Sequence, residues 1–273
     1  ILSGLLPDLS NEELSDVYSL KELVDGATAK ISSERPVRIV GPGITVGKLL
    51  GNSVSLTPGE LALANHGILF ADELPLYRTE VIDFLRKPLE ERRVNMQRRG
   101  VRYSFDCNSI FLGTGNPCKC GLLYEKGGKC KCTSNDIRRY LSKISGPFLE
   151  RIDIMSEMRT ISGSDMAGIY KDEHKEESIE YKRRVESCWQ MAHERYGGSY
   201  LNGTFPEDNI RDSMRIPDSV ITYASELSEK GFFSARGFTR ILRVARTIAD
   251  LKEAADVTED DVSEASQFRL RGI

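Results

Sequence analysis

Two adjacent carboxylates, Asp72 and Glu73, directly follow the apolar run ILFA at 68–71. Such a run is typical of a buried strand in a parallel sheet, and these sheets bind ligands at the carboxyl ends of their strands. There the aspartate can hold Mg²⁺ through water, while the glutamate orients and polarises an attacking water molecule. The pattern is short, however, and it is equally compatible with two solvated acids at the end of a strand that have no catalytic role.

A second apolar run, SIFLGTG at 109–115, predicts a neighbouring strand that ends close to Asn116. An amide at the tip of that strand can hydrogen-bond an attacking water molecule or a γ-phosphate. By itself, however, an asparagine before Pro117 is better interpreted as a turn residue. Asn116 therefore gains weight only from the acids of the preceding strand.

Two arginines could complete a phosphate site. Arg151 lies in the largely apolar run PFLERIDI and could reach the phosphates of a neighbouring subunit as an arginine finger. The alternative is a surface arginine paired with Glu150 or Asp153. Arg236 falls in the first turn of a helix predicted to begin after Ser234, where a cation is disfavoured unless an anion such as phosphate is present.

Four of the six cysteines are grouped with the spacing C-x-C-x9-C-x-C, at Cys118, Cys120, Cys130 and Cys132. Four thiolates in two close pairs suit a tetrahedral Zn²⁺ site with no open position. Such a site would be structural and would brace the loop between Asn116 and Arg151. The alternative is four reduced thiols in a mobile loop.

A basic hairpin is predicted at 92–106, where strand-like alternation flanks Arg99-Gly100. Between residues 86 and 102 there are seven Lys or Arg against two Glu, with Arg98 and Arg99 at the tip. The tip could contact a nucleic-acid phosphate backbone, or it could be a solvated basic turn. The residues favour neither interpretation.

The glycine-rich stretch GPGITVGKLL at 41–50 does not fit a phosphate-binding loop. A P-loop reads G-x-x-x-x-G-K followed by Ser or Thr, but here the first glycine position is Pro42 and the hydroxyl position is Leu49. We therefore interpret the stretch as a loop that is rich in glycine.

The elements that must position these residues alternate between strand and helix in the first half of the chain, which predicts a parallel α/β core with crossover helices. We expect Thr57 to cap a helix in LTPGELALANHG, and a second helix in YRTEVIDFLRKPLEE to bury Val81, Phe84 and Leu85. From about residue 165 the pattern is helical: a charged helix at 172–195 precedes two capped helices that begin after Ser234 and Thr258. The predicted domains are therefore a core at 1–164, with its cysteine loop at 116–133, and a helical lid at 165–273.

Composition excludes few classes of function. The 273 residues are 40% hydrophobic and 29% charged, with a net charge of −3 that gives no global attraction to nucleic acid or membrane. No apolar stretch is long enough for a membrane span and no signal peptide is evident, so we expect a cytoplasmic protein without a membrane partner. The first residue is Ile1 rather than Met, which suggests a fragment of a longer protein.

The chain resembles the AAA+ module of the magnesium-chelatase-related ATPases of the YifB/ComM family, which are related to the I subunit of magnesium chelatase. The resemblance spans almost the whole chain, in family order, through GLLPDLS, PGELALANHGILFADELP, RKPLEERRVNMQR, GNPCKCG, IRRYLSKISGPFLERIDI and FSARGFTRILRVARTIADL. It implies a hexameric ring that binds ATP and Mg²⁺ at subunit interfaces. It also implies Asp72 and Glu73 as Walker B, Asn116 as sensor 1, Arg151 as arginine finger and Arg236 as sensor 2, acting in cis or in trans.

The resemblance has departures. In the family the Walker A loop lies just upstream of GLLPDLS, so we expect this chain to begin after it, to bind nucleotide weakly and to hydrolyse little alone. Gly41-Pro42 stand where the family usually has two histidines, and we expect the family's N-terminal Lon-protease-like domain to lie outside this sequence. In related rings the segment around Lys48 and the hairpin with Arg98 and Arg99 reach toward the pore, which implies that these cations contact a client or DNA there.

Three functions are compatible with the sequence. The first is a DNA branch-migration or translocation motor in recombination or natural transformation. The second is a chelatase-type ATPase motor that drives metal insertion into a porphyrin through partner subunits. The third is a zinc-braced scaffold that does not hydrolyse ATP.

Overall fold

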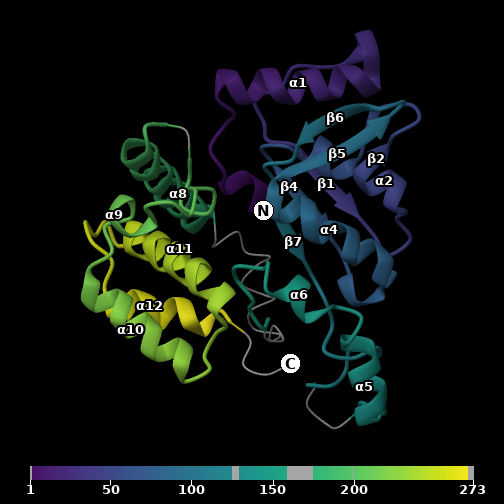
Figure 1. Ribbon diagram of the computed structural model, residues 1–273. Coiled ribbons are helices and arrows are strands. Elements are labelled where there is room, and N and C mark those ends of the chain that lie inside the picture. Colours follow the sequence, from purple (N-terminus) through teal and green to yellow (C-terminus); the bar gives the residue numbers. More distant parts are fainter. Residues whose placement is uncertain (1, 125–128, 159–174, 199, 270–273) are drawn as a thin grey trace. The chain divides into compact units, whose positions relative to one another are not determined.

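The computed structural model describes residues 2–124, 129–158, 175–198 and 200–269 (Figure 1). The chain divides into two compact units: a sheet unit, Asp8–Arg151, and a helical unit, Ile1–Pro7 with Ile152–Ile273. The domain boundary predicted between residues 164 and 165 lies outside the described residues and stays a prediction.

The sheet unit is built on three parallel strands in the order β1 (Val37–Val40), β4 (Ile68–Ala71) and β7 (Ile110–Gly113) (Figure 1). The central strand β4 is the most buried, as its continuous apolar run predicts. Both neighbours pair with it in parallel, which requires crossover connections. With the helical second unit, this sheet confirms the predicted fold class.

The other elements of the sheet unit are α1 (Asn11–Asp25), η2 (Gly26–Thr28), α2 (Val46–Leu50), β2 (Gly51–Asn52), β3 (Thr57–Pro58), α3 (Glu60–Leu63), η3 (Leu74–Leu76), α4 (Thr79–Glu91), β5 (Arg93–Arg98), β6 (Val101–Asp106), α5 (Ser134–Leu141) and α6 (Gly146–Leu149).

The predicted helix cap at Thr57 is wrong. Thr57 belongs to β3, which pairs with β2, and α3 begins only at Glu60 with Gly59 as its N-cap. The pairing brings the two backbones so close that a Cβ atom on Gly59 would lie 2.3 Å from the Gly51 nitrogen. Strand pairing therefore occupies the residues that the local pattern assigned to a capping box.

Two further expectations need correction. Phe84 is 50% exposed, because the buried face of α4 is formed by Val81, Ile82, Leu85 and Pro88 instead. The stretch 41–50 is not a loop throughout, since Thr45 caps the short helix α2 and Leu49 of that helix is fully buried.

The predicted hairpin is confirmed as β5 and β6, which pair antiparallel up to Arg98 and Val101. Arg99 and Gly100 form its turn with φ of 48° and 80°. Positive φ at both central residues is what a two-residue hairpin turn that matches the twist of its strands requires. The tip therefore presents Arg99, which is exposed, at a defined place.

A network of ion pairs fastens α1 to the start of the sheet. Arg35 donates to both carboxylate oxygens of Glu13, at 3.0 and 2.9 Å, and the ring of His66 contacts Glu13 and Asp16. Burial raises the pKa of Glu13, but hydrogen bonds with His66, Arg35 and the Ser10 N–H outweigh it and lower that pKa to about 2. For His66, burial lowers the pKa, yet its hydrogen bonds with Glu13 and Asp16 raise it above 6.5.

We expect Glu13→Gln to lower the free energy of unfolding by on the order of 2 kcal/mol at pH 5.5, because the partly buried Arg35 loses its charged partner. The folded-state pKa of Glu13 is depressed, so its contribution is complete above about pH 4.5 and is lost as the pH falls toward 2. His66 has a raised folded-state pKa, so its contribution is complete below pH 6.5 and is lost as the pH rises through that raised value.

Denaturant unfolding from pH 3 to pH 8 measures this effect. Glu12→Gln is the matched control, because Glu12 is the exposed neighbour in the same first turn of α1. Equal losses in the two variants, or a Glu13→Gln effect that persists unchanged at pH 3, would contradict the expectation.

The helical unit contains η1 (Leu2–Leu5), α8 (Lys175–Tyr196), α9 (Ile210–Ser213), α10 (Asp218–Glu229), α11 (Ala235–Leu251) and α12 (Glu259–Gln267) (Figure 1). The predicted caps are confirmed: the Ser234 hydroxyl accepts from the Gly237 N–H, and Thr258 forms a capping box with Asp261. The first residues of the predicted helix at 172–195 lie outside the described part of the chain.

A buried charge cluster holds the helical unit together beside its apolar core. Asp250, 1% exposed, forms ion pairs with Arg195 of α8 and with Arg246 of α11. Arg246 is fully buried and also donates to the carbonyls of Met214, Ala254 and Ala255. These contacts satisfy charges that would be costly to bury alone. Among the described helices, none is both long and apolar enough to cross a membrane.

Candidate functional site

The two predicted carboxylates lie at the end of β4 and are joined to the end of β7 by Thr114. The Thr114 hydroxyl donates to Asp72 Oδ1 at 2.7 Å and accepts from the Glu73 N–H at 3.0 Å. This contact follows from strand register, because Ala71 pairs with Gly113 and the next residues on both strands therefore meet. Sequence reasoning missed Thr114, although its place directly after the second apolar run was the available signal.

The backbone at Glu73 is held in the left-handed region, with φ of 53° and ψ of 48°. A non-glycine residue there costs on the order of 1–3 kcal/mol, and such strain gathers at functional sites. The turn is held by Thr114, whose hydroxyl binds the Glu73 N–H and whose carbonyl accepts from the Leu74 N–H at 2.8 Å. Glu73 is half-buried and Asp72 is exposed, so both carboxylates can meet a ligand from solvent.

Tyr77 binds the end of the neighbouring strand β1 through its hydroxyl group. Its buried hydroxyl donates to the Val40 carbonyl at 2.7 Å, at the end of β1. Burial and the negative charge of Asp72 raise the pKa of Tyr77 to about 12. The phenol is therefore a neutral structural donor next to the carboxylates.

Asn116 follows Thr114 by two residues and is exposed. Its side chain lies against the turn at Gly121, where a Cβ atom would be 3.9 Å from Asn116 Cγ. The same turn is closed by a hydrogen bond from the Gly121 N–H to the Cys118 carbonyl. Asn116 is thus close in the fold both to the carboxylates, through Thr114, and to the cysteine cluster.

Tyr140 of α5 is a second residue that sequence reasoning missed. It is 6% exposed, and burial raises the pKa of its phenol. A backbone hydrogen bond from Asn116 acts in the opposite direction, while the charges of Glu73 and Cys118 raise the pKa further. Tyr140 therefore stands where the predicted catalytic residues and the cysteine cluster meet.

The four grouped cysteines converge, with all their sulfur atoms within 4.8 Å of one another. The Sγ–Sγ separations are 3.3 Å for Cys118–Cys120, 3.8 Å for Cys118–Cys130 and 3.5 Å for Cys120–Cys130. Zn–S bonds of about 2.3 Å place tetrahedral sulfurs about 3.8 Å apart, so the spacing and chemistry of this donor set fit zinc. The cluster could bind a metal ion, as its spacing in the sequence predicts.

Arg151 is paired within its own unit. Its Nε donates to Glu90 Oε2 at 3.1 Å, Nη2 contacts the same oxygen, and Nη1 donates to the Pro147 carbonyl. The surface pairing considered from the sequence is wrong for Asp153, which instead binds Arg240 at 2.7 Å. The partner Glu90 lies 61 residues away in the sequence, so no local pattern could have identified it.

The remaining predicted residues are placed in part. Arg236 is the second residue of α11, in the first turn as predicted, and its side chain lies outside what the structure describes. Lys48 on α2 and Arg99 at the hairpin tip are exposed, while Arg98 is half-buried.

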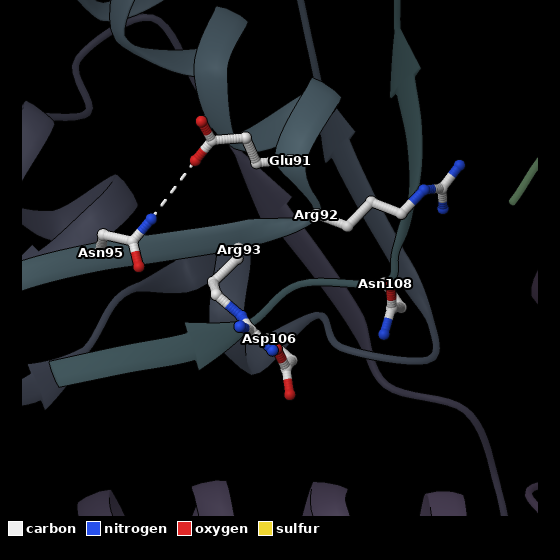
Figure 2. A pocket seen from close by; sticks show the side chains of 6 residues that line it. All are labelled: Glu91, Arg92, Arg93, Asn95, Asp106 and Asn108. Carbon is white, nitrogen blue, oxygen red and sulfur yellow. Dashed lines mark hydrogen bonds and ion pairs between the residues drawn. The ribbon is translucent and has the colours of Figure 1, made fainter. Parts of the chain in front are cut away.

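A charged pocket lies where β5 begins and β6 ends (Figure 2), and neither Asp72 nor Glu73 lines it. It is lined by Glu91, Arg92, Arg93, Asn95, Asp106 and Asn108. Arg93 pairs with Asp106 at 2.8 Å, and Asn95 donates to Glu91 at 3.3 Å. The charged side chains of this pocket are largely paired with one another. We therefore take the carboxylates at the end of β4, rather than this pocket, as the candidate functional site.

Two family models and several curated relatives match this chain. The family model described as magnesium chelatase, subunit ChlI, matches residues 1–166, and that of the ChlI C-terminal region matches residues 175–269. The uncharacterized protein YifB of Escherichia coli is 30% identical, with 98% of this chain and 52% of the relative covered. The competence protein ComM of Haemophilus influenzae is 29% identical, with 98% and 52% covered. The magnesium-chelatase subunit ChlI of Chlorella vulgaris is 33% identical, with 97% and 69% covered. The chain therefore spans about half the length of the YifB and ComM relatives.

Proposed function

The chain belongs to the magnesium chelatase subunit ChlI family, and from this premise we propose that it is part of a ring-forming, Mg²⁺-dependent AAA+ ATPase of the YifB/ComM type. The observation that carries the proposal is the pair of carboxylates at the end of β4, tied to the end of β7 through Thr114. This is the position at which an open parallel sheet binds its ligand.

In the proposed mechanism each residue has one task. Asp72 would hold Mg²⁺, normally through water, and that ion would neutralise charge developing on the phosphates. Glu73 would orient and polarise the attacking water molecule, and Asn116 would hydrogen-bond this water or the γ-phosphate. Arg151 would reach the nucleotide of a neighbouring subunit, and Arg236 would contact phosphate from the helical unit, in cis or in trans.

We further propose that the Walker A loop comes from another part of the full-length protein. Among the described strands, none pairs with the outer edge of β7, and Ile110 on that strand is 42% exposed. A further parallel strand could pair there and bring a phosphate-binding loop beside Asp72. The stretch 41–50 lacks the P-loop spacing, so this chain alone would bind nucleotide weakly and hydrolyse little.

The cysteine cluster would hold a structural Zn²⁺. Four thiolates leave no coordination position for substrate, which is the arrangement of structural rather than catalytic zinc. Since Cys118 follows Asn116 by two residues and both lie near Tyr140, the zinc would fix the loop that carries the water-positioning amide.

For the client we favour DNA, in branch migration or translocation. The support is the basic hairpin tip, the exposed Lys48 and the 29% identity to a competence protein. The chelatase-type motor is the second candidate, because the Chlorella vulgaris ChlI protein is 33% identical and a larger share of it is covered. A zinc-braced scaffold without hydrolysis is the third.

The test is ATP hydrolysis by the full-length protein with and without branched DNA. We expect branched DNA to stimulate turnover, and Arg98→Ala with Arg99→Ala to weaken DNA binding and lower the salt slope by up to about two units. Arg86→Ala with Lys87→Ala is the matched control, because these cations on α4 pair with Asp83 and Glu91. Turnover that DNA does not change would count against the DNA client, and the complete absence of hydrolysis would favour the scaffold.

A further inference from the structure

The Arg151 side chain donates hydrogen bonds to one carboxylate from α4. Glu90 Oε2 accepts from both Nε and Nη2, and the Pro147 carbonyl accepts from Nη1. A guanidinium has five N–H groups in a rigid planar fork. With three of these groups engaged, one N–H remains on each terminal nitrogen, and such a pair can bind a phosphate.

The Arg151 backbone is fixed separately, by the core. Its N–H donates to the Phe148 carbonyl at 2.9 Å, and Phe148 is fully buried. The Phe148 ring packs edge-on against Phe111 of β7, with ring centroids 5.8 Å apart. The core therefore fixes the position of the Arg151 backbone, while the hydrogen bonds to Glu90 hold the end of its long side chain.

We propose that Glu90 is a positioning residue for Arg151, which holds the guanidinium so that its terminal N–H groups face a phosphate of the neighbouring subunit. This inference rests on the proposed function, in which Arg151 is an arginine finger. A long flexible side chain loses rotamer entropy when it meets the transition state, and a carboxylate that orients it beforehand lowers that cost.

Exposure decides whether Glu90 orients Arg151 or merely neutralises it. The Glu90 side chain is 59% exposed, whereas that of Arg151 is 19% exposed. Water and salt therefore screen the carboxylate charge, and a pair of this kind adds little to the stability of the fold. The loss of Glu90 should thus disturb the direction of Arg151 without unfolding the protein.

The experiment compares ATP turnover of Glu90→Gln, Arg151→Ala and the double variant in the full-length protein. We expect Arg151→Ala to lower kcat at least about 100-fold, since fingers contribute 10³–10⁵. Glu90→Gln should lower kcat about 5- to 20-fold with KM for ATP unchanged, and the double variant should equal Arg151→Ala because both act through one group. Glu91→Gln is the matched control, since Glu91 neighbours Glu90 but contacts Asn95 and Lys87.

The outcomes separate the two levels of the argument. If Arg151→Ala kept wild-type turnover, Arg151 would not be an arginine finger, and the positioning role of Glu90 would be overturned as well. An inactive Arg151→Ala beside an unchanged or faster Glu90→Gln overturns only the role of Glu90. So does a double variant that is slower than Arg151→Ala by the full factor of Glu90→Gln, because the effect of Glu90 would then not pass through Arg151.

A measurement without activity tests the contact itself. The Nε–H of Arg151 should exchange with solvent more slowly than that of exposed Arg99 in NMR spectra, and Glu90→Gln should remove this protection while Glu91→Gln keeps it. Equal exchange of the Arg151 and Arg99 groups in the unaltered protein would overturn the proposal, whatever the stability of the variants.

Discussion

Replacing Glu73 by glutamine is expected to lower ATP hydrolysis by the full-length protein about 10²- to 10⁴-fold while Mg²⁺–ATP still binds. An amide of the same size cannot accept a proton from the attacking water or polarise it as a carboxylate does. The fold should survive, because the Thr114 hydroxyl accepts from the backbone N–H of Glu73 rather than from its side chain. Steady-state turnover and equilibrium binding of ATP, measured on the same preparation, separate the two effects.

A matched control is Glu80→Gln, which alters an exposed carboxylate in the first turn of α4. This variant should keep its turnover within about twofold, since surface changes of this kind are usually small. If Glu73→Gln also turned over normally, Glu73 would not be the residue that activates the attacking water molecule.

The second large effect concerns the metal. Protein purified without chelator should carry about one Zn²⁺ per chain, and Cys118→Ser should abolish this content, because a closed tetrahedral site needs all four ligands. Cys118 is fully buried in the cluster, so water from the solvent cannot easily replace its thiolate as a zinc ligand. Metal analysis by mass spectrometry gives the zinc content directly.

Zinc loss should also lower ATP turnover of the full-length protein, since the loop that carries Asn116 would no longer be fixed by the metal. Cys188→Ser is the matched control, because Cys188 lies on α8 outside the cluster. Its zinc content should match that of the unaltered protein. Absence of zinc from the unaltered protein would contradict the proposed zinc site. Full turnover in a zinc-free Cys118→Ser variant would show that turnover does not depend on the zinc.

Local patterns predicted those parts of the fold whose interactions are short in sequence. The apolar run before Asp72, the turn at Arg99-Gly100 and the cap at Ser234 each depend on residues within a few positions, and all were confirmed. The same local reasoning failed at Thr57, where a cap competed with strand pairing to Asn52, and at Phe84, whose burial depended on which face of α4 packs into the fold.

The candidate site divides in the same way. Asp72, Glu73, Asn116 and the cysteines could be named from the sequence, because strand ends and ligand spacing are local. Their roles stay predictions. The contact partners could not be named: Thr114 meets Asp72 across 42 residues.

The sequence by itself thus determined which elements form and which residue types stand at their ends, because strands, turns and caps follow from side-chain periodicity and backbone chemistry over a few residues. Only the tertiary structure decided that Thr114 joins the two strand ends, that Tyr140 meets Asn116, and that Glu90 accepts hydrogen bonds from Arg151. The physical reason is that these contacts arise from parallel strand register and helix packing, which bring together side chains that no local spacing relates.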